Sequence, residues 1–167
     1  VEASARGQDT VAIVMNLRWD VLAWNHAHSV IFRDYGTIPV AERNLLEILL
    51  TRPVQHMTES QLETTARRMV ARLRFDYSRS TEDPKFEALV RRLSTASPRF
   101  ARLWRIPAFT LRAFGVHKFT HPRFGELAFE HTSTVPDGHP NLRVVICTPD
   151  NPAAKRAIEQ VNAELRR

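Results

Sequence analysis

The stretch TVAIVMNLRWDVLAWN, residues 10–25, decides the fold of this chain, because apolar residues recur at alternate positions along both halves. This period of two predicts two extended strands, 11–15 and 19–24, joined by a turn at Asn16–Arg18. Asn25 then precedes an apolar segment with helical spacing and is a favourable N-cap, so a helix is expected at 26–32. A β-hairpin followed directly by a helix is therefore the starting unit of the fold.

Outward from this hairpin, the apolar period changes twice. Helical spacing continues through the middle of the chain, with predicted helices at 42–50, 60–77, from Pro84 and from Pro98, and a capping box proposed at Ser60–Glu63. Alternation returns for three strands near 116–119, 127–135 and 142–148, before a helix at 153–165. This order predicts an α+β, PAS-like fold: a five-stranded antiparallel sheet with a helical insertion between strands 2 and 3 and a C-terminal helix.

Composition limits the class of protein. The 167 residues are 43% hydrophobic and 25% charged, which is typical of one globular domain. No apolar run approaches the roughly 18–20 residues that a membrane span requires, and no signal peptide is recognisable, so we expect a cytoplasmic protein without a membrane partner. The single cysteine, Cys147, excludes an internal disulfide and is expected to be a buried structural thiol.

The basic charge is concentrated in the middle of the chain. The net charge is +6, and residues 67–112 contain 12 cations against 4 acids. One interpretation is a nucleic-acid-binding or dimerisation surface built from this basic helical block. The other is a set of solvated helix faces, since no aromatic stacking platform accompanies the arginines. The second interpretation predicts exposed side chains at Arg67, Arg68, Arg72, Arg74, Arg91 and Arg92.

No arrangement of residues typical of catalysis is present. The five glycines are scattered, so neither a phosphate-binding loop nor a nucleophile elbow can be drawn. His117 and His131 fall on adjacent predicted strands and could bind a metal with Glu126 or Glu130, but no metal-binding spacing supports such a site. We therefore expect no catalytic residue, no metal and no enzyme activity, and we interpret these histidines as surface or pocket residues.

Six segments together resemble a known family. They are RWDVLAWN (18–25), ERNLLEILLTRP (42–53), ARRMVARLR (66–74), DPKFEALVRRLSTASPRFARLW (83–104), KFTHPRFGEL (118–127) and LRVVICTPD (142–150). In this order and spacing they are similar to the C-terminal ligand-binding domain of MmyB-like (MltR-like) bacterial transcription regulators of the XRE helix-turn-helix family.

The resemblance implies a small-molecule sensory domain. Residues 1–9 would be a linker from a preceding helix-turn-helix domain, through which alone the protein contacts DNA, and residues 10–167 would form the PAS-like ligand-binding domain. No cofactor is required, and the implied ligand is a fatty acid or a similar apolar or amphipathic molecule. By analogy with other PAS-like regulators, we expect a homodimer.

The ligand is expected in a cavity between the sheet and the helices, because helices close over one face of a PAS-like sheet. We predict that the lining residues are Ile13, Met15, Val21, Phe32, Leu46, Leu49, Met69, Leu73, Phe119, Phe129, His131, Val144 and Ile146. Strand parity leaves the opposite set open, namely Val14, Leu22, Trp24, Val145 and Cys147. His131 or a nearby arginine would hold a carboxylate at the mouth, and Val144→Trp would fill the cavity.

Overall fold

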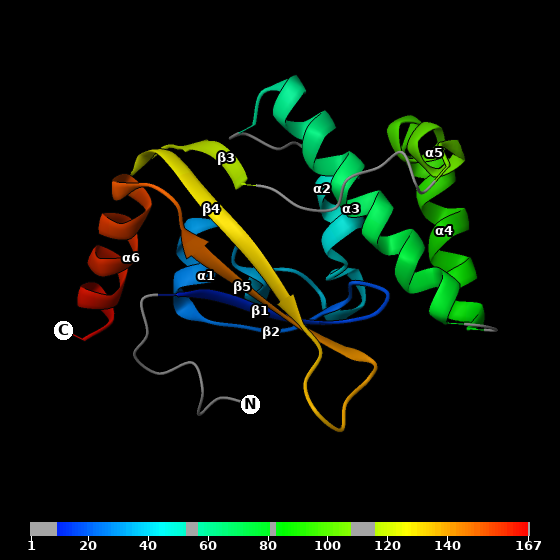
Figure 1. Ribbon diagram of the computed structural model, residues 1–167, viewed down its shortest axis with the longest axis horizontal. Coiled ribbons are helices and arrows are strands. Elements are labelled where there is room, and N and C mark those ends of the chain that lie inside the picture. Colours follow the sequence, from blue (N-terminus) through cyan, green and yellow to red (C-terminus); the bar gives the residue numbers. More distant parts are fainter. Residues whose placement is uncertain (1–9, 53–56, 81–82, 108–115, 167) are drawn as a thin grey trace.

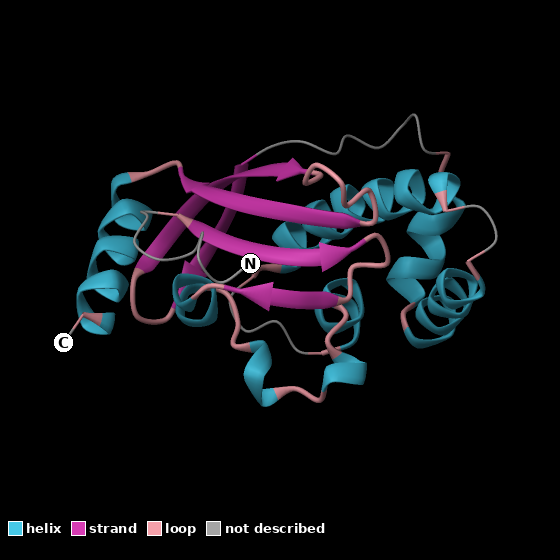
Figure 2. Cartoon of the chain, turned by 90° about the horizontal axis from the view of Figure 1, so that it is seen from below, coloured by secondary structure: helices cyan, strands magenta, loops and turns pink. Residues whose placement is uncertain are grey.

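A five-stranded antiparallel sheet in the order β2-β1-β5-β4-β3 forms the centre of the molecule (Figure 1). The computed structural model describes residues 10–52, 57–80, 83–107 and 116–166. Figure 2 shows the five strands side by side, with α6 at one end of the sheet and α4 and α5 at the other. The predicted PAS-like α+β fold, with its helical insertion between strands 2 and 3, is confirmed.

The elements follow the chain in the predicted order. Their bounds are β1 Val11–Asn16, β2 Val21–Trp24, α1 His26–Ile31, η2 Tyr35–Thr37, η3 Val40–Glu42, α2 Leu45–Thr51, α3 Glu59–Arg79, α4 Pro84–Ala96, α5 Pro98–Arg105, β3 Val116–His121, β4 Gly125–Thr134, β5 Leu142–Pro149 and α6 Pro152–Leu165. None of the helices in the described ranges is both long and apolar enough to cross a membrane.

Short polar side chains fix where the helices begin. Asn25, Asn44 and Asn151 each accept a backbone N–H in the first turn of the helix that follows. The capping box predicted at Ser60–Glu63 is wrong, since the box consists of Thr58 and Gln61. The N-cap of α3 therefore lies two residues before the predicted one, because the hydroxyl that accepts the free N–H of Gln61 comes from Thr58.

A β-bulge sets which residues of β2 point inward. Met15 pairs with Val21 whereas Val14 pairs with Ala23, so Leu22 is the extra residue on β2. Val21 is consequently buried, while Leu22 is 52% exposed. The preceding turn is fixed by Trp19, which has a φ of 69°. Its carbonyl oxygen accepts the N–H of Leu45 at 2.9 Å, and its own N–H donates to the carbonyl oxygen of Asn16 at 3.0 Å, so hydrogen bonds on both sides hold this strained conformation.

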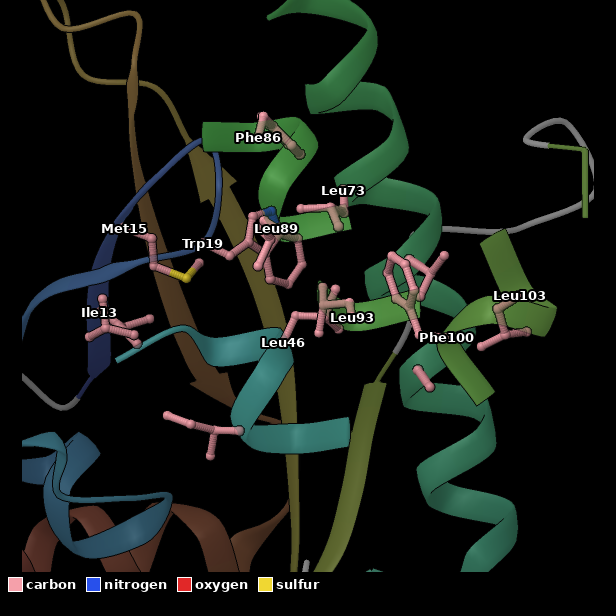
Figure 3. Packing of buried hydrophobic residues seen from close by; sticks show 14 of the residues in the cluster. Ile13, Met15, Trp19, Leu46, Leu73, Phe86, Leu89, Leu93, Phe100 and Leu103 are labelled. Carbon is pink, nitrogen blue, oxygen red and sulfur yellow. The ribbon is translucent and has the colours of Figure 1, made fainter. Parts of the chain in front are cut away.

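Two hydrophobic cores cover the inner face of the sheet, which is the face of Val11, Ile13 and Met15. The insertion core joins Ile13 and Met15 to apolar residues of α2, α3, α4 and α5, including Leu46, Leu73, Leu93 and Phe100 (Figure 3). The α6 core joins Val11 to α1, α6 and the aromatic residues of β3 and β4. Val145 on β5 packs against both cores, which places the junction between them at the middle of the sheet.

The strand register corrects one expectation from the sequence. Val144 pairs with Val14, and Ile146 pairs with Ala12. Both residues therefore lie on the outer face, opposite to Ile13 and Met15. The inward residues of β5 are Arg143, Val145 and Cys147. Val145 and Cys147 belong to the alternative set of lining residues that strand parity left open. The alternation along 142–148 is apolar on both faces, so the pattern alone could not distinguish them.

Candidate functional site

The inner face of β4 changes from buried to exposed halfway along the strand. Leu127 and Phe129 are 1% and 0% exposed, whereas the next two inward residues, His131 and Ser133, are exposed. Ser133 pairs with Val145, the residue at the junction of the two cores. We call His131 and Ser133 the open strip, because the helices in the described part of the chain leave these two inward positions accessible.

Helix α3 passes over this strip. In its N-terminal half, the Thr65 hydroxyl lies 3.3 Å from Nδ1 of His117 on β3. In its C-terminal half, Asp76 accepts a hydrogen bond from Arg143 on β5. Because β4 lies between β3 and β5, the middle of α3 lies on the inner side of β4. The half-buried Met69 and Arg72 lie between these two anchor points.

Aromatic rings form one wall of the site. The Phe32 ring, at the end of α1, has its centroid 5.2 Å from that of Phe119, 5.4 Å from that of Phe129 and 6.0 Å from that of His131. His117 also lies close, with 5.5 Å between its ring centroid and that of His131. These rings offer an apolar surface beside the open strip, of the kind that lines small-molecule sites.

The imidazoles around Phe32 are neutral at physiological pH. Burial is the main cause that lowers the pKa values of His28, His117 and His131 to about 4, and the Arg68 charge lowers those of His117 and His131 further. His28 is 5% exposed, and its Nδ1 has no hydrogen-bond partner within the described residues. His131 is exposed, although the rings of Phe32 and His117 lie beside its imidazole.

A charged group lies buried at the other end of the site. Arg143 and Asp76 are 2% and 1% exposed, and Nη2 of Arg143 donates to Oδ1 of Asp76. The indole Nε1 of Trp19 donates to Oδ2 of the same carboxylate at 3.1 Å. Arg72 places its Nε 3.8 Å from Oδ1. This group therefore links α3 to β5 and to the turn after β1.

The structure separates the predicted site residues into sets. Those buried in the insertion core are Ile13, Met15, Val21, Leu46 and Leu73, and Met69 packs against that core. Phe32, Phe119 and Phe129 belong to the α6 core or pack against it, His131 lies on the open strip, and Leu49 is half-buried on α2. Val144 and Ile146 lie on the outer face and so take no part in an inner-face site. For the remaining residues, ligand contact stays a prediction.

Sequence reasoning did not name Ser133, His28, Arg72 or Arg143 as site residues. The alternation that placed His131 inward placed Ser133 inward as well, so this residue was available from the pattern. Arg143 stands at the start of an otherwise apolar strand, and its burial depends on Asp76, 67 positions away. No local pattern indicates such a pairing.

Intramolecular ion pairs use part of the basic block. Arg67, Arg91 and Arg92 are exposed as predicted, whereas Arg68, Arg72 and Arg74 are half-buried. The Glu63 carboxylate accepts hydrogen bonds from Arg67 at 2.9 Å, from Arg102 at 2.7 Å and from Arg99 at 3.2 Å, and the Arg102 bond is the main cause that lowers its pKa. Arg92 likewise pairs with Glu47 at 2.8 Å.

Other potential sites in the described part of the chain are weaker. No three His, Cys, Asp or Glu side chains lie there in an arrangement that could hold a metal ion. Two surface pockets, of about 400 and 450 Å³, lie beside α2 and between α3, α4 and α5, and their linings include none of the predicted site residues. Cys147 is 2% exposed, and burial raises its pKa to about 12, as expected for a structural thiol.

Comparison with known proteins identifies the family. The family model described as MmyB-like transcription regulator ligand binding domain matches residues 5–161, nearly the whole chain. The comparison with curated proteins gives no match. The family consists of regulatory ligand-binding domains and is not an enzyme family. The chain therefore belongs to the MmyB-like transcription regulator ligand binding domains.

Proposed function

We propose that this domain senses an apolar or amphipathic small molecule, with a fatty acid as the leading candidate, bound between the inner face of the sheet and α3. The observation that carries the proposal is the open strip, where His131 and Ser133 stay accessible beside the Phe32 aromatic wall although they share a face with two packed cores. Burying an alkyl chain stabilises a complex by about 0.8 kcal/mol per methylene, so ten carbons contribute about 8 kcal/mol, which is of the same order as the cost of association.

Binding at this place would act on both cores. Val145 contacts the insertion core and the α6 core, and it pairs with Ser133. A ligand on the open strip would therefore favour one relative arrangement of the two cores over another. Such a difference in affinity is what a ligand needs to shift a population and so to bias an attached DNA-binding domain. We propose that residues 1–9, which lie outside the described residues, link that domain to the sheet, and that the protein is a cytoplasmic homodimer.

Native mass spectrometry of the purified chain tests for a bound molecule, since a co-purified ligand appears as added mass. A pair of variants then tests the location. Ser133→Trp places a large ring on the open strip, whereas Thr132→Trp places the same ring at the neighbouring exposed position that points to the outer face. Titration with dodecanoate should show at least tenfold weaker binding for Ser133→Trp and unchanged binding for Thr132→Trp.

The outcome that would overturn this location is equal affinity of both variants and the unmodified chain. Val144→Trp, suggested from the sequence as the blocking variant, becomes a second control. Val144 lies on the outer face, so this variant should leave dodecanoate binding unchanged. Circular dichroism of each variant confirms that a loss of binding is not a loss of folding.

A further inference from the structure

We propose that Arg72 and Arg143, beside Asp76, bind the carboxylate head group of the ligand. This inference rests on the proposed function and adds to it the position of the head group and the residues that hold it. The arrangement of charges in the described part of the chain carries it.

The first observation is an excess of positive charge in a buried place. Arg143 is 2% exposed, and the side chain of Arg72 is 29% exposed, so two guanidinium groups share one carboxylate, that of Asp76. The pKa of Arg143 is lowered, chiefly by burial. The Asp76 carboxylate opposes this shift, and the positive charges of Arg72 and Arg79 add to it. An uncompensated cation in such surroundings is costly, and a ligand anion would remove that cost.

The second observation is a pair of donors without acceptors. Within the described residues, Nε of Arg72 and Nε of Arg143 are both buried and have no hydrogen-bond partner. The two carboxylate oxygens of Asp76 accept from other donors, Oδ1 from Nη2 of Arg143 and Oδ2 from Nε1 of Trp19. The 3.8 Å between Nε of Arg72 and Oδ1 is too long for a hydrogen bond. Buried polar groups are normally satisfied, so these two donors indicate a missing acceptor.

The third observation is the position of this pair relative to the open strip. Arg143 is the inward residue next to Val145 on β5, and Val145 pairs with Ser133. Cys147, two inward positions from Arg143, pairs with His131. Four residues of a strand span roughly 13 Å, so a ligand with its acid group at Arg143 would extend along the strip to the aromatic wall. His131, the other candidate for holding the carboxylate, lies at the opposite end of the strip, beside the aromatic wall.

The test compares an acid with a neutral molecule of equal chain length. Dodecanoate and dodecanol are titrated calorimetrically at pH 7.5 into the delipidated 167-residue chain, its Arg72→Gln variant and its Arg91→Gln variant. Arg72 is half-buried and Arg91 is exposed on α4, so both variants are expected to fold. The unmodified chain should bind dodecanoate at least tenfold more tightly than dodecanol, because hydrogen bonds to charged groups are among the strong ones.

Arg72→Gln should remove this preference for the acid and leave dodecanol affinity unchanged, while Arg91→Gln should behave as the unmodified chain. Arg72→Lys, which keeps the charge, should retain part of the preference. Equal binding of acid and alcohol by the unmodified chain, or a preference that survives Arg72→Gln, would overturn the inference and leave the proposed function intact. Failure of both molecules to bind would overturn both.

Discussion

Trp19 and Asp76 join the turn after β1 to the C-terminal half of α3, with 3.1 Å between the indole Nε1 and the carboxylate Oδ2. Both residues are buried, at 6% and 1% exposure. The contact bridges 57 positions of sequence, so it ties the N-terminal hairpin to the helical insertion. The charged group around Asp76 is therefore a structural link as well as a candidate binding element, and its stability can be tested separately from ligand binding.

Replacing Trp19 by Phe should lower the free energy of unfolding by about 2 kcal/mol, because a buried hydrogen bond to a carboxylate is lost while the aromatic ring is kept. Urea denaturation measures the change. Trp24→Phe is the matched control, since its indole donates at 2.8 Å to the neutral hydroxyl of Ser29 in a half-buried place, and it should cost about half as much. Equal losses for the two variants would contradict a special role for the carboxylate.

Asp76→Asn should destabilise the fold by about 3–5 kcal/mol, because it leaves the buried guanidinium of Arg143 without its counter-ion. Glu59→Gln removes a carboxylate that is 79% exposed and pairs with Arg99, so it should change stability by less than 1 kcal/mol. The double variant Asp76→Asn/Arg143→Met should recover part of the loss, since no buried charge remains. Chemical denaturation measures the free energy of unfolding of all three variants. A double variant less stable than Asp76→Asn would contradict this account.

Stability should decrease as the pH falls from 6.5 to 4. The histidines have an ordinary pKa of 6.5, and burial lowers the pKa of His28 and of His117 to about 4 in the folded chain. The unfolded chain therefore binds more protons within this window, so the free energy of unfolding rises with pH there. The largest contribution of the 5%-exposed His28 is about 3 kcal/mol, from about 1.4 kcal/mol per pH unit.

Urea unfolding at pH 7.5, 6 and 5 measures this dependence, and His28→Leu should make it shallower. Replacement of the exposed His139 by Gln should leave the slope unchanged. Glu63, whose pKa the Arg102 hydrogen bond chiefly lowers from 4.5, contributes stability above pH 4.5 that is lost below it, so its effect begins below the lowest pH measured here. A slope unaffected by His28→Leu would show that this ring is not the buried neutral group described above.

Thr58→Ala should destabilise the fold by about 1 kcal/mol, because the Thr58 hydroxyl accepts the N–H of Gln61 and completes the capping box of α3. Ser60→Ala, the cap that the sequence pattern favoured, should cost less than 0.5 kcal/mol, since Ser60 is an exposed residue of the first turn. Thermal unfolding of the two variants distinguishes the true cap, and a larger loss for Ser60→Ala would contradict the structure.

The order of elements and the sheet were predictable, because the change of apolar period from two to 3.6 and back is a local property of the chain. The inward parity of β5 was not, since Val144, Val145 and Ile146 are all apolar and either face would accept them. The bulge at Leu22 reverses parity within β2 and also has no local signature. Burial of Arg143 depends on Asp76, and exposure of Ser133 depends on how far the two cores extend over the sheet. These are tertiary properties, so they required the structure.

Strand β5 pairs with β1 on one side and with β4 on the other. Without it, the remaining strands form two separate hairpins, β1–β2 and β3–β4, and isolated two-stranded hairpins are only marginally stable in water. During synthesis on the ribosome, the sheet therefore cannot close until residues 142–149 have emerged. The hairpin at residues 11–24 has to wait for nearly the whole domain, and this long delay is typical of folds with slow, non-local strand pairing.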